Sequence, residues 1–83
     1  MGEEVVFEGV VVGFEQVEGF EASSIYIQGS INNEQKAFYL LIDTNTYKKI
    51  LRLGIGQAIS GKGVVVSSND TLVIKAEHVS LKQ

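Results

Sequence analysis

The sequence predicts an all-β domain with a small helical part, in which five strands form a closed Greek-key barrel and one short helix lies between the third and fourth strands. Most of the chain alternates apolar and polar residues with the period of two that is typical of half-buried strands. Nine glycines and no proline occur among the 83 residues, and glycines inside strands indicate sharp bends. Only the segment around residues 44–55 spaces its apolar residues as a helix does.

The first two strands are expected at about Val5–Val17 and Ser23–Ile31. Gly9 and Gly13 mark bends in the first strand. A small closed barrel needs such a bent strand, because one strand must serve both halves of the sheet. The second strand places its isoleucines and Gly29 on one face and polar residues on the other, so it should be half-buried.

The third strand is expected at Lys36–Asp43, after a hairpin turn over residues 32–35, because asparagine tolerates positive φ. It is almost entirely apolar, so both of its faces should be at least partly covered. Several candidate N-cap residues follow it. The expected apolar stripe of the helix comprises Tyr47, Ile50, Leu51 and Ile55, with Gly54 and Gly56 as stop signals.

Such a short helix is not stable alone, so we expect it to close one end of the barrel. The fourth strand is expected at about Gln57–Ser67 and the fifth at Thr71–Leu81, separated by a turn over residues 68–70. We find no repeat or linker, so residues 1–83 are expected to form a single domain.

The overall charge is acidic but unevenly distributed. The formal net charge is −3, which opposes phosphate binding. The first 21 residues contain six glutamates and no lysine or arginine, a charge of −6, whereas the rest has seven basic against four acidic residues, a charge of +3. One part of the surface is therefore expected to be basic, with ordinary solubilising charge as the alternative.

Two classes of structure are excluded by composition. The chain contains no cysteine, which excludes disulfides and thiolate metal sites. No apolar run approaches the length of a membrane span, and the acidic start lacks the order of a signal peptide. We therefore expect a soluble, cytoplasmic domain with no membrane partner.

The second half of the chain carries the most specific pattern. Gly56 leaves the helix, an alternating strand passes through Gly63, and the last strand contains Ala76 followed by Val79. This arrangement resembles the closing hairpin of OB-folds, and the chain resembles a stand-alone OB domain of the replication-protein-A-like or single-strand-binding type. An SH3-like barrel and an unrelated β-sandwich are the alternatives.

The resemblance implies a binding module, since OB domains mostly bind single-stranded nucleic acid but also oligosaccharides or other proteins. Aromatic side chains would stack on bases and cations would contact phosphates. The usual face is formed by the second and third strands. The candidate nucleic-acid-binding residues are Tyr26, Gln28, Tyr39, Lys36, Lys62, Lys75 and Phe20.

Each candidate also has a purely structural interpretation. Tyr26 would be an ordinary exposed strand tyrosine, and Tyr39 would pack against the short helix. Phe20 would lie at the edge of the core, beside glutamates that repel phosphate. The lysines would form a solvated surface.

Catalysis finds little support in the sequence, and we expect no enzymatic activity, no cofactor and no metal. His78 is the only histidine and has no partner at the spacing of a catalytic triad or metal site. The acidic residues Glu15, Glu18 and Glu21 match no calcium-binding loop. No phosphate-binding loop or nucleophile elbow occurs.

The alternative function is a protein-interaction OB domain that acts as a small accessory subunit or forms a homo-oligomer. The acidic composition and the run Val64–Val66 favour it, because a valine-rich edge strand pairs readily with another chain.

Overall fold

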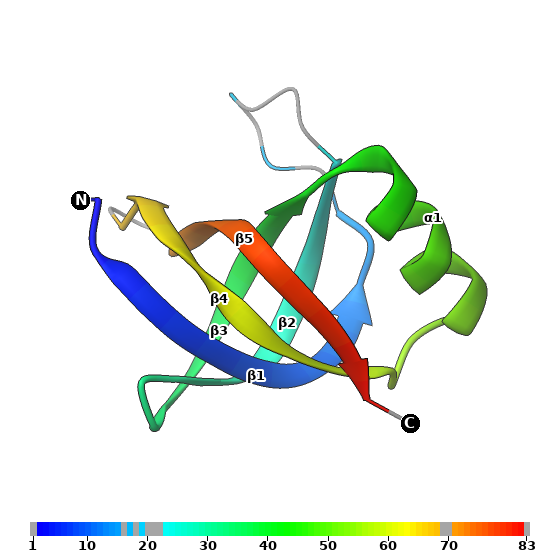
Figure 1. Cartoon of the computed structure of the whole chain (residues 1–83), viewed down its shortest axis with the longest axis horizontal. Helices are drawn as coiled ribbons and strands as arrows, with labels where there is room; N and C mark the ends of the chain where they lie inside the picture. Colours follow the sequence, from blue (N-terminus) through cyan, green and yellow to red (C-terminus); the bar gives the residue numbers. More distant parts are fainter. Residues whose placement is uncertain (1, 16, 18, 20–22, 69–70, 83) are drawn as a thin grey trace.

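The computed structural model describes residues 2–15, 17, 19, 23–68 and 71–82. Its elements are β1 (Glu4–Gly13), β2 (Ser23–Ile31), β3 (Glu34–Ile42), α1 (Thr44–Leu53), β4 (Ala58–Ser67) and β5 (Val73–Lys82). The strands close into a barrel in the order β1-β2-β3-β5-β4 (Figure 1), with β3 and β5 parallel and the other pairs antiparallel. The predicted fold class, a five-stranded Greek-key barrel of the OB type with a short helix between strands 3 and 4, is confirmed.

The long first strand serves both halves of the barrel, as predicted. Residues 7–10 of β1 pair with β2 on one side and with β4 on the other, and β1 curves across the barrel in Figure 1. Gly9 lies directly opposite Gly29 of β2. A Cβ atom on Gly9 would lie 2.6 Å from the carbonyl oxygen of Gln28, so this close approach of β1 and β2 requires a residue without a side chain.

The predicted end of the first strand is wrong, because β1 stops at Gly13 instead of Val17. The pairing with β2 shifts register between Val11 and Gly13. Beyond it, Phe14 leaves the sheet and packs edge-on against Tyr47, with ring centroids 6.0 Å apart. The N–H of Val17 donates to the Ser24 hydroxyl at 3.1 Å, so a side chain replaces the strand partner.

The β2–β3 hairpin is tighter than predicted. Its turn needs only Asn32 and Asn33, with φ angles of 50° and 71°, the combination that suits a two-residue hairpin loop. As a result β3 begins at Glu34, two residues before the expected start at Lys36. The predicted bounds of β2 agree with the structure.

The inner faces of all five strands contribute to one apolar core. The fully buried side chains with the largest volume include Phe7 and Phe38, whose rings meet edge to face with centroids 5.9 Å apart. Ile25 and Ile27 of β2 and Leu40 of β3 are also fully buried. The predicted inward face of β2 is therefore confirmed, and the burial of Leu41 beside Leu40 agrees with the expectation that both faces of β3 are covered in part.

The helix α1 lies at the barrel end where β3 stops and β4 starts (Figure 1). Asp43 caps its N-terminus by accepting hydrogen bonds from the backbone N–H and hydroxyl of Thr46, and Gly54 ends it at a φ of 87°. Ile50 is fully buried, whereas Leu51 and Ile55 are 49% and 67% exposed. Thus the predicted apolar stripe is only partly correct. Among the described residues no helix is long and apolar enough to cross a membrane.

The expectation that Val64–Val66 lies on an edge strand is wrong. Val64 pairs with Glu4 of β1 and also with Lys75 of β5, because barrel closure places β4 between these two strands. The structure therefore gives no support for strand addition by a partner at Val64–Val66. Strand β4 starts at Ala58 and β5 covers Val73–Lys82, each close to its predicted position.

Candidate functional site

Two of the predicted aromatic residues meet on the outside of the barrel. Since Ile25 and Ile27 point inward, Tyr26 points outward. Tyr26 lies directly opposite Tyr39 of β3, and their ring centroids are 4.7 Å apart with planes tilted by 43°. Both side chains are half-buried. We call the outer surface of β2 and β3 around this pair the tyrosine face.

Tyr39 forms a hydrogen bond that the sequence analysis did not anticipate. Its hydroxyl donates to Oε2 of Glu15 at 2.8 Å. This hydrogen bond stabilises the neutral phenol and, together with desolvation and the nearby carboxylate charge, raises the pKa of Tyr39 above its ordinary value. The interpretation of Tyr39 as a residue that packs on the helix is therefore replaced by a position on the outer face, where it contacts Tyr26 and Glu15.

The backbone that carries Glu15 is anchored to β2. Ser24 is almost fully buried, and its hydroxyl donates to the carbonyl oxygen of Glu15 at 2.6 Å while it accepts from the N–H of Val17. These two bonds hold the start of the β1–β2 connection against the sheet. In the sequence, Glu15 is one of several acidic residues and nothing distinguishes it from the others. Its contact with Tyr39 depends on the tertiary structure.

Two further predicted residues extend the tyrosine face. Gln28 follows Tyr26 on the outer side of β2 and is exposed. Lys75 of β5 is exposed and lies opposite Leu41, which shares the outer side of β3 with Tyr39. The structure therefore brings Tyr26, Tyr39, Gln28 and Lys75 onto one surface.

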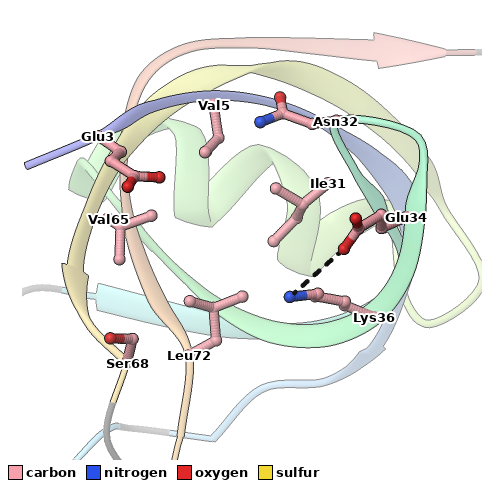
Figure 2. Close-up of a pocket in the computed structure, with 9 residues that line it drawn as sticks. All are labelled: Glu3, Val5, Ile31, Asn32, Glu34, Lys36, Val65, Ser68 and Leu72. Carbon is pink, nitrogen blue, oxygen red and sulfur yellow. Dashed lines mark ion pairs between the residues drawn. The ribbon is translucent and has the colours of Figure 1, made fainter. Parts of the chain in front are cut away.

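Lys36 lies elsewhere, at the barrel end opposite α1 (Figure 2). It alternates with Phe38 on the inner side of β3, and its ammonium group lies 3.8 Å from the Glu34 carboxylate. The surrounding cavity, the barrel mouth, has a volume of about 310 Å³. It is lined by Glu3, Val5, Ile31, Asn32, Glu34, Lys36, Val65, Ser68 and Leu72.

The remaining predicted residues do not join the tyrosine face in the described structure. Lys62 is exposed on β4, where it pairs with Val6 of β1 and His78 of β5. Since β5 separates β4 from β3, Lys62 lies around the barrel from the two tyrosines. Phe20, together with Glu18 and Glu21, lies outside the described residues.

A shallow hollow of about 560 Å³ continues the tyrosine face along β2. Ser30, the next outward residue after Gln28, lines it together with Gln35 of β3. Lys82 also lines the hollow, and its ammonium group lies 3.4 Å from the Glu8 carboxylate. Lys82 was missed by the sequence analysis, because only barrel closure brings the last strand beside this end of the hollow.

The described residues contain no cluster of three or more histidine, aspartate or glutamate side chains that could hold a metal ion. Nε2 of His78 lies 3.2 Å from the Ser80 hydroxyl on the exposed side of β5. No protein-family model and no curated protein shows a significant match to this chain.

Proposed function

We propose that this domain is a binding module for single-stranded nucleic acid, of the replication-protein-A-like or single-strand-binding type, and not an enzyme. The observation that carries the proposal is the pair Tyr26–Tyr39, which meets on the outer surface of β2 and β3. In a barrel of this type, that surface is the usual ligand face. Stacking on an aromatic side chain contributes about 1–3 kcal/mol per base and tolerates any base.

Few lysines lie near the tyrosine face, so contacts between lysines and phosphates should contribute only a small part of the binding free energy. Lys75 lies beside Leu41 on one side, and Lys82 lines the hollow that continues along β2. Lys82 is already paired with Glu8. Lys36 and Lys62 would reach phosphates only where a bound strand extends past the face. We therefore expect one or two phosphate contacts, which correspond to a slope of about −0.7 to −1.4 in log K against log salt concentration.

The test is fluorescence anisotropy with a labelled oligo-dT at two salt concentrations. Tyr26→Ala and Tyr39→Ala should each weaken binding about tenfold, as expected for one lost stacking contact. Tyr47→Phe is a control away from the tyrosine face, since Tyr47 lies in α1 and packs on Phe14, and it should bind as the wild type does. The proposal fails if Tyr26→Ala and the wild type bind equally, or if the wild type does not bind.

Lys75→Ala against Lys62→Ala gives a second comparison on the same assay. Both lysines are exposed on outer strand positions, but only Lys75 adjoins the tyrosine face. The proposal predicts a smaller salt slope for Lys75→Ala and little change for Lys62→Ala. Equal effects of the two substitutions would favour diffuse attraction over a defined face.

A second candidate function, association with a protein partner or a second copy of the chain, is favoured by one observation. Leu51, Leu53 and Ile55 are large aliphatic residues close together in sequence, and each is about half exposed or more. Size-exclusion chromatography with light scattering tests self-association. A dimer that Leu53→Ser dissociates would support it, whereas a monomer at every concentration would leave only a different protein as partner.

A further inference from the structure

We propose that Glu15 makes the tyrosine face selective for guanine among the four bases. This inference rests on the proposed function, since it concerns the ligand of the same face. It follows from a feature that otherwise opposes nucleic-acid binding, namely a carboxylate hydrogen-bonded to one of the two stacking residues.

The geometry puts the carboxylate at the rim of the stacking surface. The rings of Tyr26 and Tyr39 pack against each other, with centroids 4.7 Å apart and planes tilted by 43°, and Glu15 Oε2 lies 2.8 Å from the Tyr39 hydroxyl. A base that stacks on Tyr39 therefore has one edge beside the carboxylate. The Glu15 side chain is exposed, and a carboxylate has about four acceptor positions, so the Tyr39 hydroxyl leaves acceptor capacity for a ligand.

The position of Glu15 is held before any ligand arrives. Its carbonyl oxygen accepts from the buried Ser24 hydroxyl, and its carboxylate accepts from Tyr39. The two bonds link Glu15 to β2 and to β3 at once. Binding therefore does not require the ordering of a free loop residue, which lowers the entropic cost of a specific contact.

An ionised carboxylate only accepts hydrogen bonds, so the bound base must donate. Guanine presents two neighbouring donors, N1–H and the 2-amino group, which match the two oxygens of a carboxylate. Cytosine and adenine present one amino group next to a ring nitrogen that accepts, and that lone pair faces the second oxygen. Thymine and uracil present one N–H between two carbonyl oxygens. Only guanine satisfies both oxygens without placing an acceptor against them.

The same carboxylate penalises ligands that leave it unsatisfied. A base without suitable donors would cover Glu15 and remove water from its charge without replacing those hydrogen bonds. The charge also repels nearby phosphates. Discrimination therefore has an attractive and a repulsive part, both centred on one side chain.

The test compares short oligonucleotides that differ at one central base, TTGTT, TTTTT and the inosine analogue TTITT, by fluorescence anisotropy. One well-formed pair of hydrogen bonds to a base corresponds to a preference of about tenfold or more. The wild type should therefore bind TTGTT about tenfold more tightly than TTTTT. Inosine, which lacks the 2-amino group, should fall between them.

Glu15→Gln and Glu15→Ala should reduce the guanine preference to about twofold or less while binding to TTTTT stays equal or becomes tighter. Glu77→Gln is the matched control, because Glu77 is exposed on β5 at a position that the β3–β5 pairing does not include. It should keep the full preference. Circular dichroism of each variant checks that the fold is retained.

The outcomes separate the two proposals. If the wild type binds none of the three oligonucleotides, the proposed function itself is wrong. If it binds all three equally and Tyr26→Ala weakens this binding about tenfold, the function stands and the guanine inference is overturned. A preference that survives Glu15→Ala would likewise overturn the role of Glu15.

Discussion

Substitution of Gly9 by alanine tests the close approach of the paired strands β1 and β2 at Gly9 and Gly29. An alanine Cβ would lie 2.6 Å from the Gln28 carbonyl oxygen, 2.8 Å from Ile27 Cγ2 and 2.9 Å from Gly29 Cα. Ordinary contacts of a Cβ atom begin at about 3.4 Å, so β2 would have to move away by roughly 0.8 Å. Two of the three obstacles are backbone atoms, which cannot rotate out of the way.

The expected cost follows from overpacking. Inserting a methyl group into a packed interior destabilises by about 1–3 kcal/mol, and the upper end applies here because the backbone must yield. The lower entropy of the unfolded alanine chain offsets about 0.4–1 kcal/mol. We therefore expect Gly9→Ala to lower the free energy of unfolding by about 2 kcal/mol, and the melting temperature by about 8–16 °C for a domain of this size.

Gly13→Ala is the matched control in the same strand. Its Cβ would meet nothing closer than 3.8 Å, the distance to Tyr26 Cβ. It should be neutral or stabilising by a few tenths of a kcal/mol. Urea and thermal denaturation followed by circular dichroism would measure both variants. Equal stabilities of Gly9→Ala and Gly13→Ala would refute the close approach of β1 and β2 at Gly9.

Three further perturbations address the helix and the tyrosine face. Ile50→Ala should destabilise by about 2–5 kcal/mol because Ile50 is fully buried at the end of the barrel, whereas the half-exposed Leu51→Ala should stay within about 0.5 kcal/mol; equal costs in urea denaturation would contradict the placement of α1. Asp43→Ala should lower the urea midpoint at neutral pH, because the hydrogen bonds from Thr46 stabilise the ionised Asp43 cap and lower its pKa. The stability that this ionised cap contributes is lost as pH falls through the lowered pKa. A difference in urea midpoint between the wild type and Asp43→Ala that persists in acid would be inconsistent with capping. The pKa of Tyr39 is raised by Glu15, so the stability from this bond is complete below the ordinary tyrosine pKa of about 10 and is lost as pH rises through the raised value. Glu15→Gln should shift one tyrosine to a lower pKa in a spectrophotometric titration, and an unchanged curve would argue against the contact.

The period-two alternation predicted the strands well, because inner and outer residues of a barrel differ in polarity at every step. Ile25 and Ile27 identified the inner face of β2, and that alone placed Tyr26 outside. Strand ends were harder to predict. Val17 has strand propensity, but its N–H bonds to the Ser24 side chain, a contact that no local pattern reveals.

The site was predicted only in part, for a related reason. Alternation placed Tyr39 and Tyr26 on the same kind of surface, but their direct pairing depends on the register of β2 and β3. Lys36 shares the inner side of β3 with Phe38, and its position at the start of the strand places it in the barrel mouth. Composition could not show this, because a lysine on the inner side is tolerated only where the barrel opens to water.

The binding of single-stranded nucleic acid to the tyrosine face can be followed residue by residue in an NMR titration of the isotopically labelled protein with a short oligonucleotide containing guanine. The proposal predicts that backbone amide signals of Tyr26, Gln28 and Tyr39 shift progressively, while those of Lys49 and Arg52 on the exposed side of α1 stay in place. Shifts confined to α1, or no shifts at millimolar oligonucleotide, would contradict it.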